Sequence, residues 1–97
     1  MNKKFILTRI RDCRQDIRQR FSVKRLSVFG SVVRDEVDDG SDVDVLVVFD
    51  RQANFDIFME LKFYLEDLLG MRVDLVTDKA LRPQVRRAIE QEMIDVA

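Results

Sequence analysis

The sequence contains few of the residue types that serve most enzyme sites and cross-linked folds. It has no histidine and, among 97 residues, one cysteine, Cys13. Without histidine, a metal site must be built from oxygen ligands, and a general base must be a carboxylate, a lysine or a tyrosine. A single cysteine excludes an internal disulfide framework and suits a reducing compartment, so we expect a cytoplasmic protein.

Long apolar segments, proline and glycine are also scarce. The longest segment without a charged residue, 26–33, is far too short to cross a bilayer, and the N-terminus has no secretory-type apolar run, so we expect no membrane association. One proline and three glycines, with 36% charged and 46% hydrophobic residues, exclude collagen-like, low-complexity and disordered chains. A chain of this length buries about two-thirds of its unfolded surface, so we expect one domain over residues 1–97.

Charge is distributed unevenly, although the net charge is only −1. Residues 1–34 carry ten lysines and arginines against two acids, whereas residues 35–50 carry seven acids and no base. A basic segment of this kind is more often a solvated helix face than a nucleic-acid site, and no aromatic interleaving supports base stacking, which argues against a nucleic-acid partner. The acidic segment is more informative, because carboxylates this close together repel one another unless a cation joins them.

Hydrophobic periodicity divides the chain into alternating helices and strands. Apolar residues at three- to four-residue spacing predict amphipathic helices, whereas short apolar runs predict strands. Residues 43–49 are apolar on both faces from Val45 onward, as in a central strand that is covered on both sides. We therefore predict an α/β (α+β) fold with helices flanking a small mixed sheet. The predicted elements are helices over about 3–20, 55–68 and 81–94, helical turns over 31–36, and strands over 26–29, 43–49 and 71–77.

Turn and cap residues mark several of these boundaries. Gly70 stops the helix over 55–68, and Pro83 is tolerable only in the first turn of the last helix. Residues 38–41, with the sequence Asp-Asp-Gly-Ser, predict a turn before the central strand.

Gly30 and Ser31 at a predicted strand-to-helix turn are the first feature that can carry chemistry. Glycine lets the backbone approach a ligand closely, and the helical turn after Ser31 points N–H groups at an anion. The Ser31 side chain is also available to bind those N–H groups itself. Such turns are common after strands, so this one alone indicates phosphate binding only weakly.

Three aspartates form the second feature. Asp42 and Asp44 start the central strand, where side chains two apart share a face with Cα atoms about 6.6 Å apart, so both can bind one divalent cation or a pair of them. Asp74 lies in the third strand and faces both if the two strands are neighbours. The alternatives are that Asp42 only begins the strand and Asp44 is a solvated edge residue, and that Asp74 forms an ion pair with an arginine such as Arg34 or Arg72.

Together these features resemble the nucleotidyltransferase superfamily that is typified by the DNA polymerase β palm. The shared pattern is Gly30–Ser31, a spacer of ten residues, Asp42-x-Asp44, and a third acid on a later strand. The stretch that runs from Gly30 through Arg34 to Val47 is similar to the minimal nucleotidyltransferase (MNT) branch of this superfamily.

The resemblance extends to the tail and has one departure. Leu81–Arg82–Pro83 leads a closing helix that ends in Glu92–Met93–Ile94, so nearly the whole chain is covered. The family often has glycine after the arginine, whereas this chain has Asp35 after Arg34. The departure concerns the turn after Arg34 and not the metal-binding acids.

The resemblance implies a polymerase β palm-like nucleotidyltransferase fold and a role for each residue. Gly30–Ser31 would hold the β- and γ-phosphates of a nucleotide, and Arg34 would neutralise charge as pyrophosphate leaves. Asp42 and Asp44 would ligate two Mg²⁺ ions. Asp74 would complete the shell of one metal and accept the proton of an attacking hydroxyl.

We expect 97 residues to be too few for a second domain that binds the acceptor, so the acceptor should bind an exposed face or come from a partner protein. The chain resembles the MntA-like antitoxins of HEPN/MNT toxin–antitoxin pairs, which implies Mg²⁺-dependent transfer of AMP from ATP to a tyrosine of a HEPN-family ribonuclease toxin. Two alternatives stay open: an antitoxin that masks its toxin only by binding, and a nucleotidyltransferase that acts on a small molecule or an RNA end. Apolar helix faces would serve a homo-oligomer or a hetero-complex with the toxin equally well.

Overall fold

The computed structural model describes residues 2–38 and 40–97. Asp39, which belongs to the predicted turn and acidic segment, lies outside the described residues. No helix in these ranges is long and apolar enough to cross a membrane. The elements in chain order are α1 (Lys3–Asp12), α2 (Arg14–Phe21), β1 (Val23–Phe29), the 3₁₀ turn η1 (Gly30–Val32), β2 (Val43–Phe49), α3 (Phe55–Leu69), β3 (Val73–Thr77), the 3₁₀ turn η2 (Asp78–Ala80), α4 (Pro83–Glu92) and β4 (Ile94–Asp95).

The four strands form one mixed sheet in the order β3-β2-β1-β4. β2 lies between two neighbours, antiparallel to β1 and parallel to β3, and β4 pairs with β1 in antiparallel fashion. The predicted mixed sheet flanked by helices is therefore confirmed, with the bounds of β2 as predicted. The parallel pairing of β2 with β3 places the Asp74 segment beside the segment that contains Asp44.

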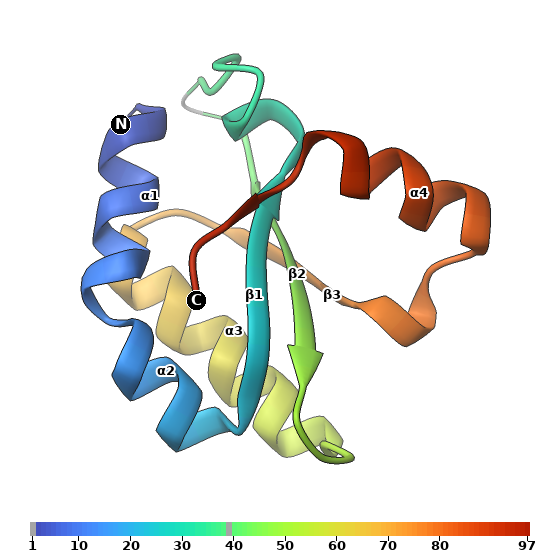
Figure 1. Cartoon of the computed structure of the whole chain (residues 1–97). Coiled ribbons are helices and arrows are strands. Elements are labelled where there is room, and N and C mark those ends of the chain that lie inside the picture. Colours follow the sequence, from blue (N-terminus) through green and yellow to red (C-terminus); the bar gives the residue numbers. More distant parts are fainter. Residues whose placement is uncertain (1, 39) are drawn as a thin grey trace.

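The core lies between the sheet and the layer formed by α1, α2 and α3, whereas α4 projects away from that layer (Figure 1). The spacing of three to four residues that predicted the helices puts Ile10, Ile17, Leu61 and Leu65 on inward faces, where all four are fully buried. Each such side chain contributes roughly 1.5–3 kcal/mol of burial free energy. The alternate residues of β2 that meet this layer are Val43, Val45 and Val47.

Two boundaries in the N-terminal half differ from the sequence prediction. The predicted helix over 3–20 is two helices, because Cys13 leaves helical geometry with φ −106° and ψ 11°. β1 begins at Val23, three residues before the predicted start, and pairs there with Phe49 at the end of β2. The charged pair Lys24 and Arg25 concealed this extended segment, because neither residue fits an apolar run.

The predicted end signals hold in the C-terminal half, but the last helix is shorter than expected. Gly70 ends α3 in the left-handed conformation with φ +66°, and Pro83 occupies the first turn of α4. The helix ends at Glu92 rather than at residue 94, because Met93 is extended with ψ 151°. The following residues form β4, which was not predicted.

Asp95 fastens β4 to the sheet edge. Its carboxylate accepts hydrogen bonds from Arg25 Nε at 2.9 Å and from the buried Ser27 hydroxyl at 2.5 Å. The backbone N–H of Val96 donates to the carbonyl of Leu26 at 2.8 Å. The Arg25 guanidinium, helped by the Ser27 hydroxyl, lowers the pKa of Asp95 below its ordinary value. These bonds fix the position of the chain directly after α4.

The turn after Arg34 explains the departure from the family pattern at Asp35. Asp35 adopts φ +59°, in the left-handed region that favours glycine. The neighbouring amides close the turn, since Asp35 N–H donates to the Val32 carbonyl at 3.1 Å and Glu36 N–H donates to the Ser31 carbonyl at 2.8 Å. The backbone shape that glycine usually supplies is thus kept, at the cost of a side chain in an unfavourable region.

Replacing Asp95 by alanine should lower the free energy of unfolding by about 1–2 kcal/mol, because the buried Ser27 hydroxyl loses its acceptor. Urea unfolding at neutral pH measures the loss. The same change in a Ser27→Ala background should lower the free energy of unfolding by less, because no buried hydroxyl is then left without an acceptor. The loss should also shrink as the pH falls through the lowered pKa of Asp95, because protonation removes the same negative charge from the wild type. Equal losses in both backgrounds would contradict this account of β4.

Replacing Asp35 by glycine should raise the free energy of unfolding by up to about 1 kcal/mol, because glycine adopts positive φ without a steric cost. Asp35→Ala is the matched control, since it removes the same charge but keeps a Cβ atom in the left-handed region. We expect no gain from the alanine variant in the same urea unfolding experiment. A gain of equal size in both variants would point to charge repulsion rather than backbone geometry.

Candidate active site

Gly30 lies against the carboxylate of Asp44. The last residue of β1, Phe29, pairs with Asp44 on β2, so the turn that follows passes directly over the aspartate. Gly30 has φ +73°, and a Cβ atom at this position would overlap the Asp44 carboxylate. Glycine is therefore required here for two reasons: the φ angle is positive, and the Asp44 carboxylate leaves no room for a Cβ atom.

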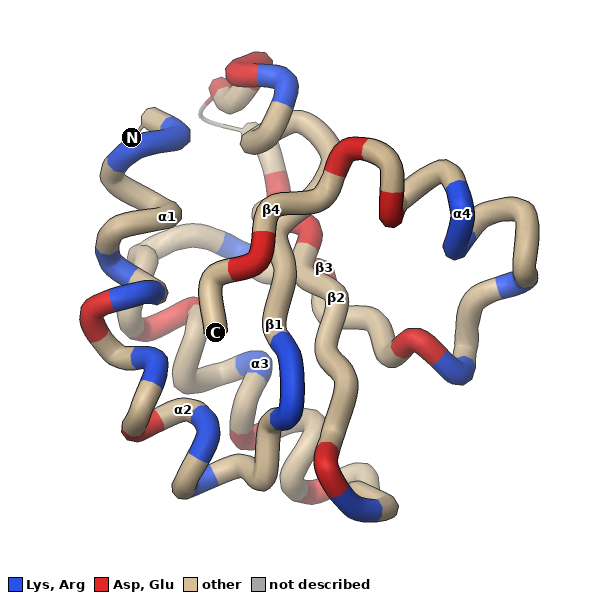
Figure 2. Tube along the Cα trace, in the orientation of Figure 1, with Lys and Arg blue, Asp and Glu red and all other residues tan. Residues whose placement is uncertain are grey.

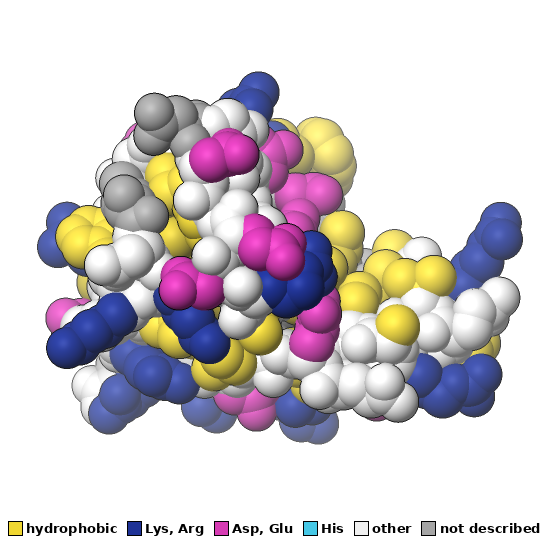
Figure 3. Space-filling model, turned by 90° about the horizontal axis from the view of Figure 1, so that it is seen from above, with side chains coloured by type: hydrophobic (Ala, Val, Ile, Leu, Met, Phe, Trp, Pro, Cys, Tyr) yellow, Lys and Arg dark blue, Asp and Glu magenta, His cyan; other side chains and the backbone are white. Residues whose placement is uncertain are grey.

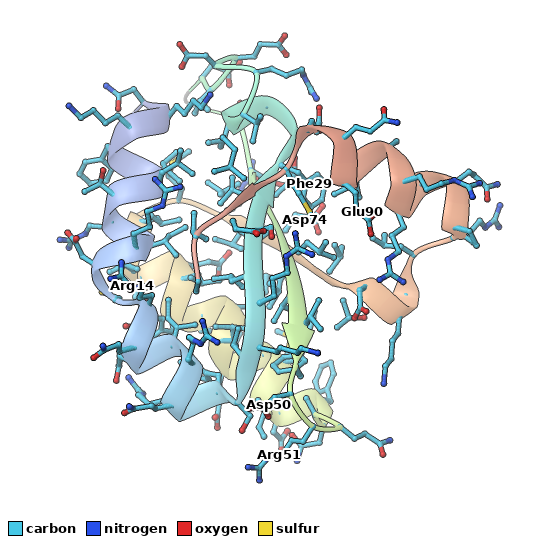
Figure 4. All side chains as sticks on the ribbon, viewed as in Figure 1. Arg14, Phe29, Asp50, Arg51, Asp74 and Glu90 are labelled. Atoms are coloured by element: carbon cyan, nitrogen blue, oxygen red, sulfur yellow. The ribbon has the colours of Figure 1, made fainter. Side chains whose placement is uncertain are left out.

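Asp44 and Asp74 are register partners on the parallel strands β2 and β3. Paired residues of neighbouring strands share a face of the sheet, so both carboxylates project from the same side. Figure 4 shows the Asp74 side chain near Phe29, at the end of the sheet from which α4 projects, while Asp50 and Arg51 lie at the other end of β2. The predicted orientation of Asp74 toward Asp42 and Asp44 is thus found for Asp44, and the alternative ion pair with an arginine is not among the salt bridges of the described residues.

The Arg34 guanidinium does not offset the negative charge around Asp44. Partial burial and the nearby carboxylates of Asp74 and Asp42 raise the pKa of Asp44, the Arg34 guanidinium opposes the rise, and Glu92 adds to it. A bound cation would relieve this repulsion. Carboxylate oxygens are the ligands that Mg²⁺ prefers, so the chemistry of these donors fits that ion.

Asp42 is engaged by an arginine. It forms an ion pair with Arg72, whose Nε lies 3.0 Å from the Asp42 carboxylate, and Arg72 also donates to the carbonyl of Gly40 at 3.2 Å. Within residues 2–38 and 40–97, no three carboxylate or thiol groups are close enough to hold one metal ion together. The pair is largely exposed, and exposed ion pairs contribute only about 0–1 kcal/mol, so releasing Asp42 to a cation costs little.

A cavity of about 320 Å³ at the β3 edge connects two of the three acids. Asp42 and Asp74 line it together with Arg72, and Lys62 and Met59 of α3 contribute from the helix side. The cavity therefore offers a hollow next to two of the predicted ligands that is large enough for hydrated ions.

Arg34 lies one turn after Ser31, as predicted, but its guanidinium forms ion pairs with two glutamates. Its guanidinium is 3.2 Å from Glu36 and 3.2 Å from Glu92. Figure 3 shows acidic side chains gathered around basic ones at this end of the molecule, beside the arm formed by α4. The two glutamates raise the pKa of Arg34, which stays charged.

Glu92 is the residue that sequence reasoning missed at this site. Its Oε1 atom accepts a hydrogen bond from the backbone N–H of Gly30 at 2.9 Å. The only sequence signal was its place in the family-like tail, which gave it no role. Ser31 also differs from the expectation, because no side-chain hydrogen bond caps the start of η1 and Phe29 stands at the cap position.

Comparisons with known proteins agree with this geometry. Residues 10–96 match the nucleotidyltransferase domain family. The protein adenylyltransferase MntA of Thermococcus cleftensis is 42% identical over 83 residues, which make up 86% of this chain and 84% of that protein. A solved structure described as a candidate minimal nucleotidyltransferase is 36% identical, with a TM-score of 0.84 and coverage of 97% of this chain and 95% of that chain.

A further solved structure shares the fold alone. It comes from a complex described as the tri-AMPylated HEPN toxin of Shewanella oneidensis with an MNT antitoxin. The matched chain is 15% identical with a TM-score of 0.68, and the match covers 94% of this chain and 71% of that chain. The family resemblance seen in the sequence is confirmed by the match over residues 10–96 and by identity over most of two related chains. This chain belongs to the nucleotidyltransferase domain family, an enzyme family in which it is similar to protein adenylyltransferases of the MntA type.

Proposed function

We propose that this nucleotidyltransferase transfers AMP from ATP to a tyrosine of a HEPN-family toxin, in a Mg²⁺-dependent reaction, and so acts as the antitoxin of the pair. The observation that carries the proposal is the register pairing of Asp44 with Asp74 beside the Gly30 turn. The relative named protein adenylyltransferase MntA and the fold shared with an MNT antitoxin support the choice of acceptor.

The carboxylates of Asp42, Asp44 and Asp74 would hold the metal ions. Asp44 and Asp74 already face the same side of the sheet, and Asp42 joins them once its exposed pair with Arg72 opens. When bound, Mg²⁺ supplies the positive charge that stabilises the attacking and leaving oxygens of the phosphoryl transfer. Burial raises the pKa of Asp44 most, and repulsion from Asp74 and Asp42 adds to the rise; a bound cation would relieve that repulsion, which supports this assignment.

Gly30, Ser31 and Arg34 would hold the phosphates of ATP. The Gly30 N–H is a backbone donor, which bonds to Glu92 Oε1 at 2.9 Å in the free protein, and glycine lets a phosphate oxygen approach it closely. The Arg34 guanidinium is positioned one turn later and supplies a fixed positive charge as pyrophosphate leaves. Ser31 adds a hydroxyl at the same turn, half-buried and unused as a helix cap.

The transfer step requires a base for the acceptor hydroxyl, and we assign that role to Asp74. The tyrosine oxygen forms a bond to the α-phosphorus of ATP, and the bond from that phosphorus to the bridging oxygen breaks to release pyrophosphate. The tyrosine proton goes to the Asp74 carboxylate. Asp74 is exposed and forms no salt bridge within the described residues, so an incoming hydroxyl can reach it.

Labelled ATP and Mg²⁺ should modify the purified cognate toxin in the presence of this chain, and replacing both Asp42 and Asp44 by alanine should abolish the labelling, because the metal ligands are lost. Asp50→Ala is the matched control, since Asp50 lies at the opposite end of β2 and the variant should label normally (Figure 4). A toxin variant with phenylalanine at the modified tyrosine should stay unlabelled.

Other outcomes of the same experiment select among the alternatives. Labelling that survives the double substitution would overturn the proposed roles of Asp42 and Asp44. Full neutralisation of the toxin without nucleotide would favour an antitoxin that acts only by binding. Label that appears on an RNA end or a small molecule in place of the toxin would favour that class of acceptor.

Replacing Asp44 by asparagine should raise the melting temperature of the metal-free protein by a few degrees at neutral pH while it removes activity. The folded state raises the pKa of Asp44, so the native protein binds the proton at a higher pH than the unfolded chain does. The ionised Asp44 therefore destabilises the fold above this pKa, and the destabilisation disappears as the pH falls through it. The variant's advantage should shrink in the same pH range.

Thermal unfolding in EDTA and in Mg²⁺ checks this prediction. Added Mg²⁺ should stabilise the wild type and leave Asp44→Asn nearly unchanged, because ligand binding stabilises only the form that binds. The control Asp50→Asn should respond to Mg²⁺ as the wild type does. An asparagine variant that melts below the wild type in EDTA would show that Asp44 stabilises the fold by a contact of its own.

A further inference from the structure

Glu92 occupies the donors that the proposed function gives to the phosphates of ATP. Its Oε1 atom lies 2.9 Å from the Gly30 nitrogen, and its Oε2 atom lies 3.2 Å from Nη1 of Arg34. The carboxylate thus binds one backbone amide and one guanidinium with its two oxygens, which is the way a phosphate binds such a pair. The contact joins residues that are 62 positions apart in the sequence.

These donors cannot serve Glu92 and a phosphate at the same time. The Gly30 N–H has a single hydrogen, and it already lies on the Glu92 carboxylate. A phosphate at this turn would also sit next to a second negative charge. Glu92 is close enough to Asp44 to add to the repulsion around that side chain. The contact with Glu92 therefore has to break before nucleotide phosphates can bind there.

We propose that Glu92 is an internal phosphate mimic, which closes the nucleotide site in the free protein and is displaced by the phosphates of ATP. The inference rests on the proposed function, because that function assigns Gly30 and Arg34 to the phosphates. Glu92 then sets the affinity for nucleotide, since the apparent affinity falls by the fraction of molecules in which the site is closed.

Displacement requires little motion of the backbone. The Glu92 side chain is 32% exposed, so its carboxylate can rotate into solvent. The backbone beyond it is held by β4, where Asp95 bonds to Arg25 and Ser27. Because β4 is held in this way, Glu92 stays close to Gly30, and the hydrogen bond between them re-forms when the nucleotide leaves.

Replacing Glu92 by glutamine tests the mimic, because glutamine has nearly the same shape and no charge. We expect ATP and inorganic tripolyphosphate to bind the variant roughly fivefold to thirtyfold more tightly than they bind the wild type in isothermal titration with EDTA present. Tripolyphosphate isolates the phosphate contacts from any contact to the base or ribose. Glu90→Gln is the matched control, since Glu90 lies on the same helix and pairs with Arg86 at 3.0 Å; its affinity should be unchanged.

The NMR signal of the Gly30 amide gives a second readout that does not depend on activity. In the wild type, tripolyphosphate should move this signal as the amide exchanges a carboxylate for a phosphate. In the Glu92→Gln variant, the signal of the free protein should already be displaced from its wild-type position. Glu90→Gln should leave the signal of the free protein in place.

The outcomes separate this inference from the proposed function. Equal or weaker phosphate binding by Glu92→Gln would overturn the mimic, and the proposed function would stand if the wild type still labels the toxin. Weaker binding only when Mg²⁺ is present would overturn it in favour of Glu92 as a metal ligand. Tighter binding by the variant, together with a wild type that labels no toxin, would support the mimic and count against the proposed acceptor. If neither protein binds tripolyphosphate, the mimic is wrong.

Discussion

Repulsion between carboxylates on neighbouring strands is the constraint around which this end of the molecule is built. Parallel pairing of β2 with β3 puts Asp44 directly beside Asp74, and the turn at Gly30 lies over Asp44 and limits its access to water. The fold meets this cost with apolar burial on the other face of the same strands, where Val43, Val45 and Val47 enter the core. One strand thus carries buried valines on one face and Asp44 at the start of the other.

The cations near the acids are arranged so that each can be released. Arg72 pairs with Asp42, and Arg34 pairs with Glu36 and Glu92, all through contacts that are at least partly exposed to water. Exposed pairs are weak, so a metal ion or a phosphate can compete for either partner. Most basic residues of α1 and α2 lie along the helical layer (Figure 2), and Lys3 at the start of α1 donates to the carbonyl of Val33 at 3.2 Å rather than to one of these acids. Proximity, and not the overall charge of the chain, therefore decides which cations act on the acids.

The sequence allowed the skeleton of the site to be predicted, but not its contacts. The strand over 43–49 is apolar on both faces from Val45 onward, which predicted a central strand, but the placement of Asp74 beside Asp44 was predicted only on the condition that the two strands are neighbours. The pairing of Asp42 with Arg72 depends on side-chain rotamers at exposed positions, which periodicity does not encode. The break at Cys13 has no glycine or proline to signal it, and β4 is two residues long, too short for an alternating pattern. Glu92 meets Gly30 only because β4 returns the chain to the sheet, so this contact could not be seen without β4.

The openness of the site fits an acceptor that is itself a protein. Asp42 and Asp74 are exposed, and α4 projects from the sheet rather than closing over them. A nucleotide held in so open a site is accessible to water, which competes with any acceptor for the activated phosphate. A small-molecule acceptor would leave most of this surface exposed to water. A protein docked over the end of the sheet would exclude water and at the same time bring its hydroxyl to the nucleotide. On the proposed function, the toxin therefore completes the active site that modifies it, and Glu92 occupies the phosphate donors until ATP binds.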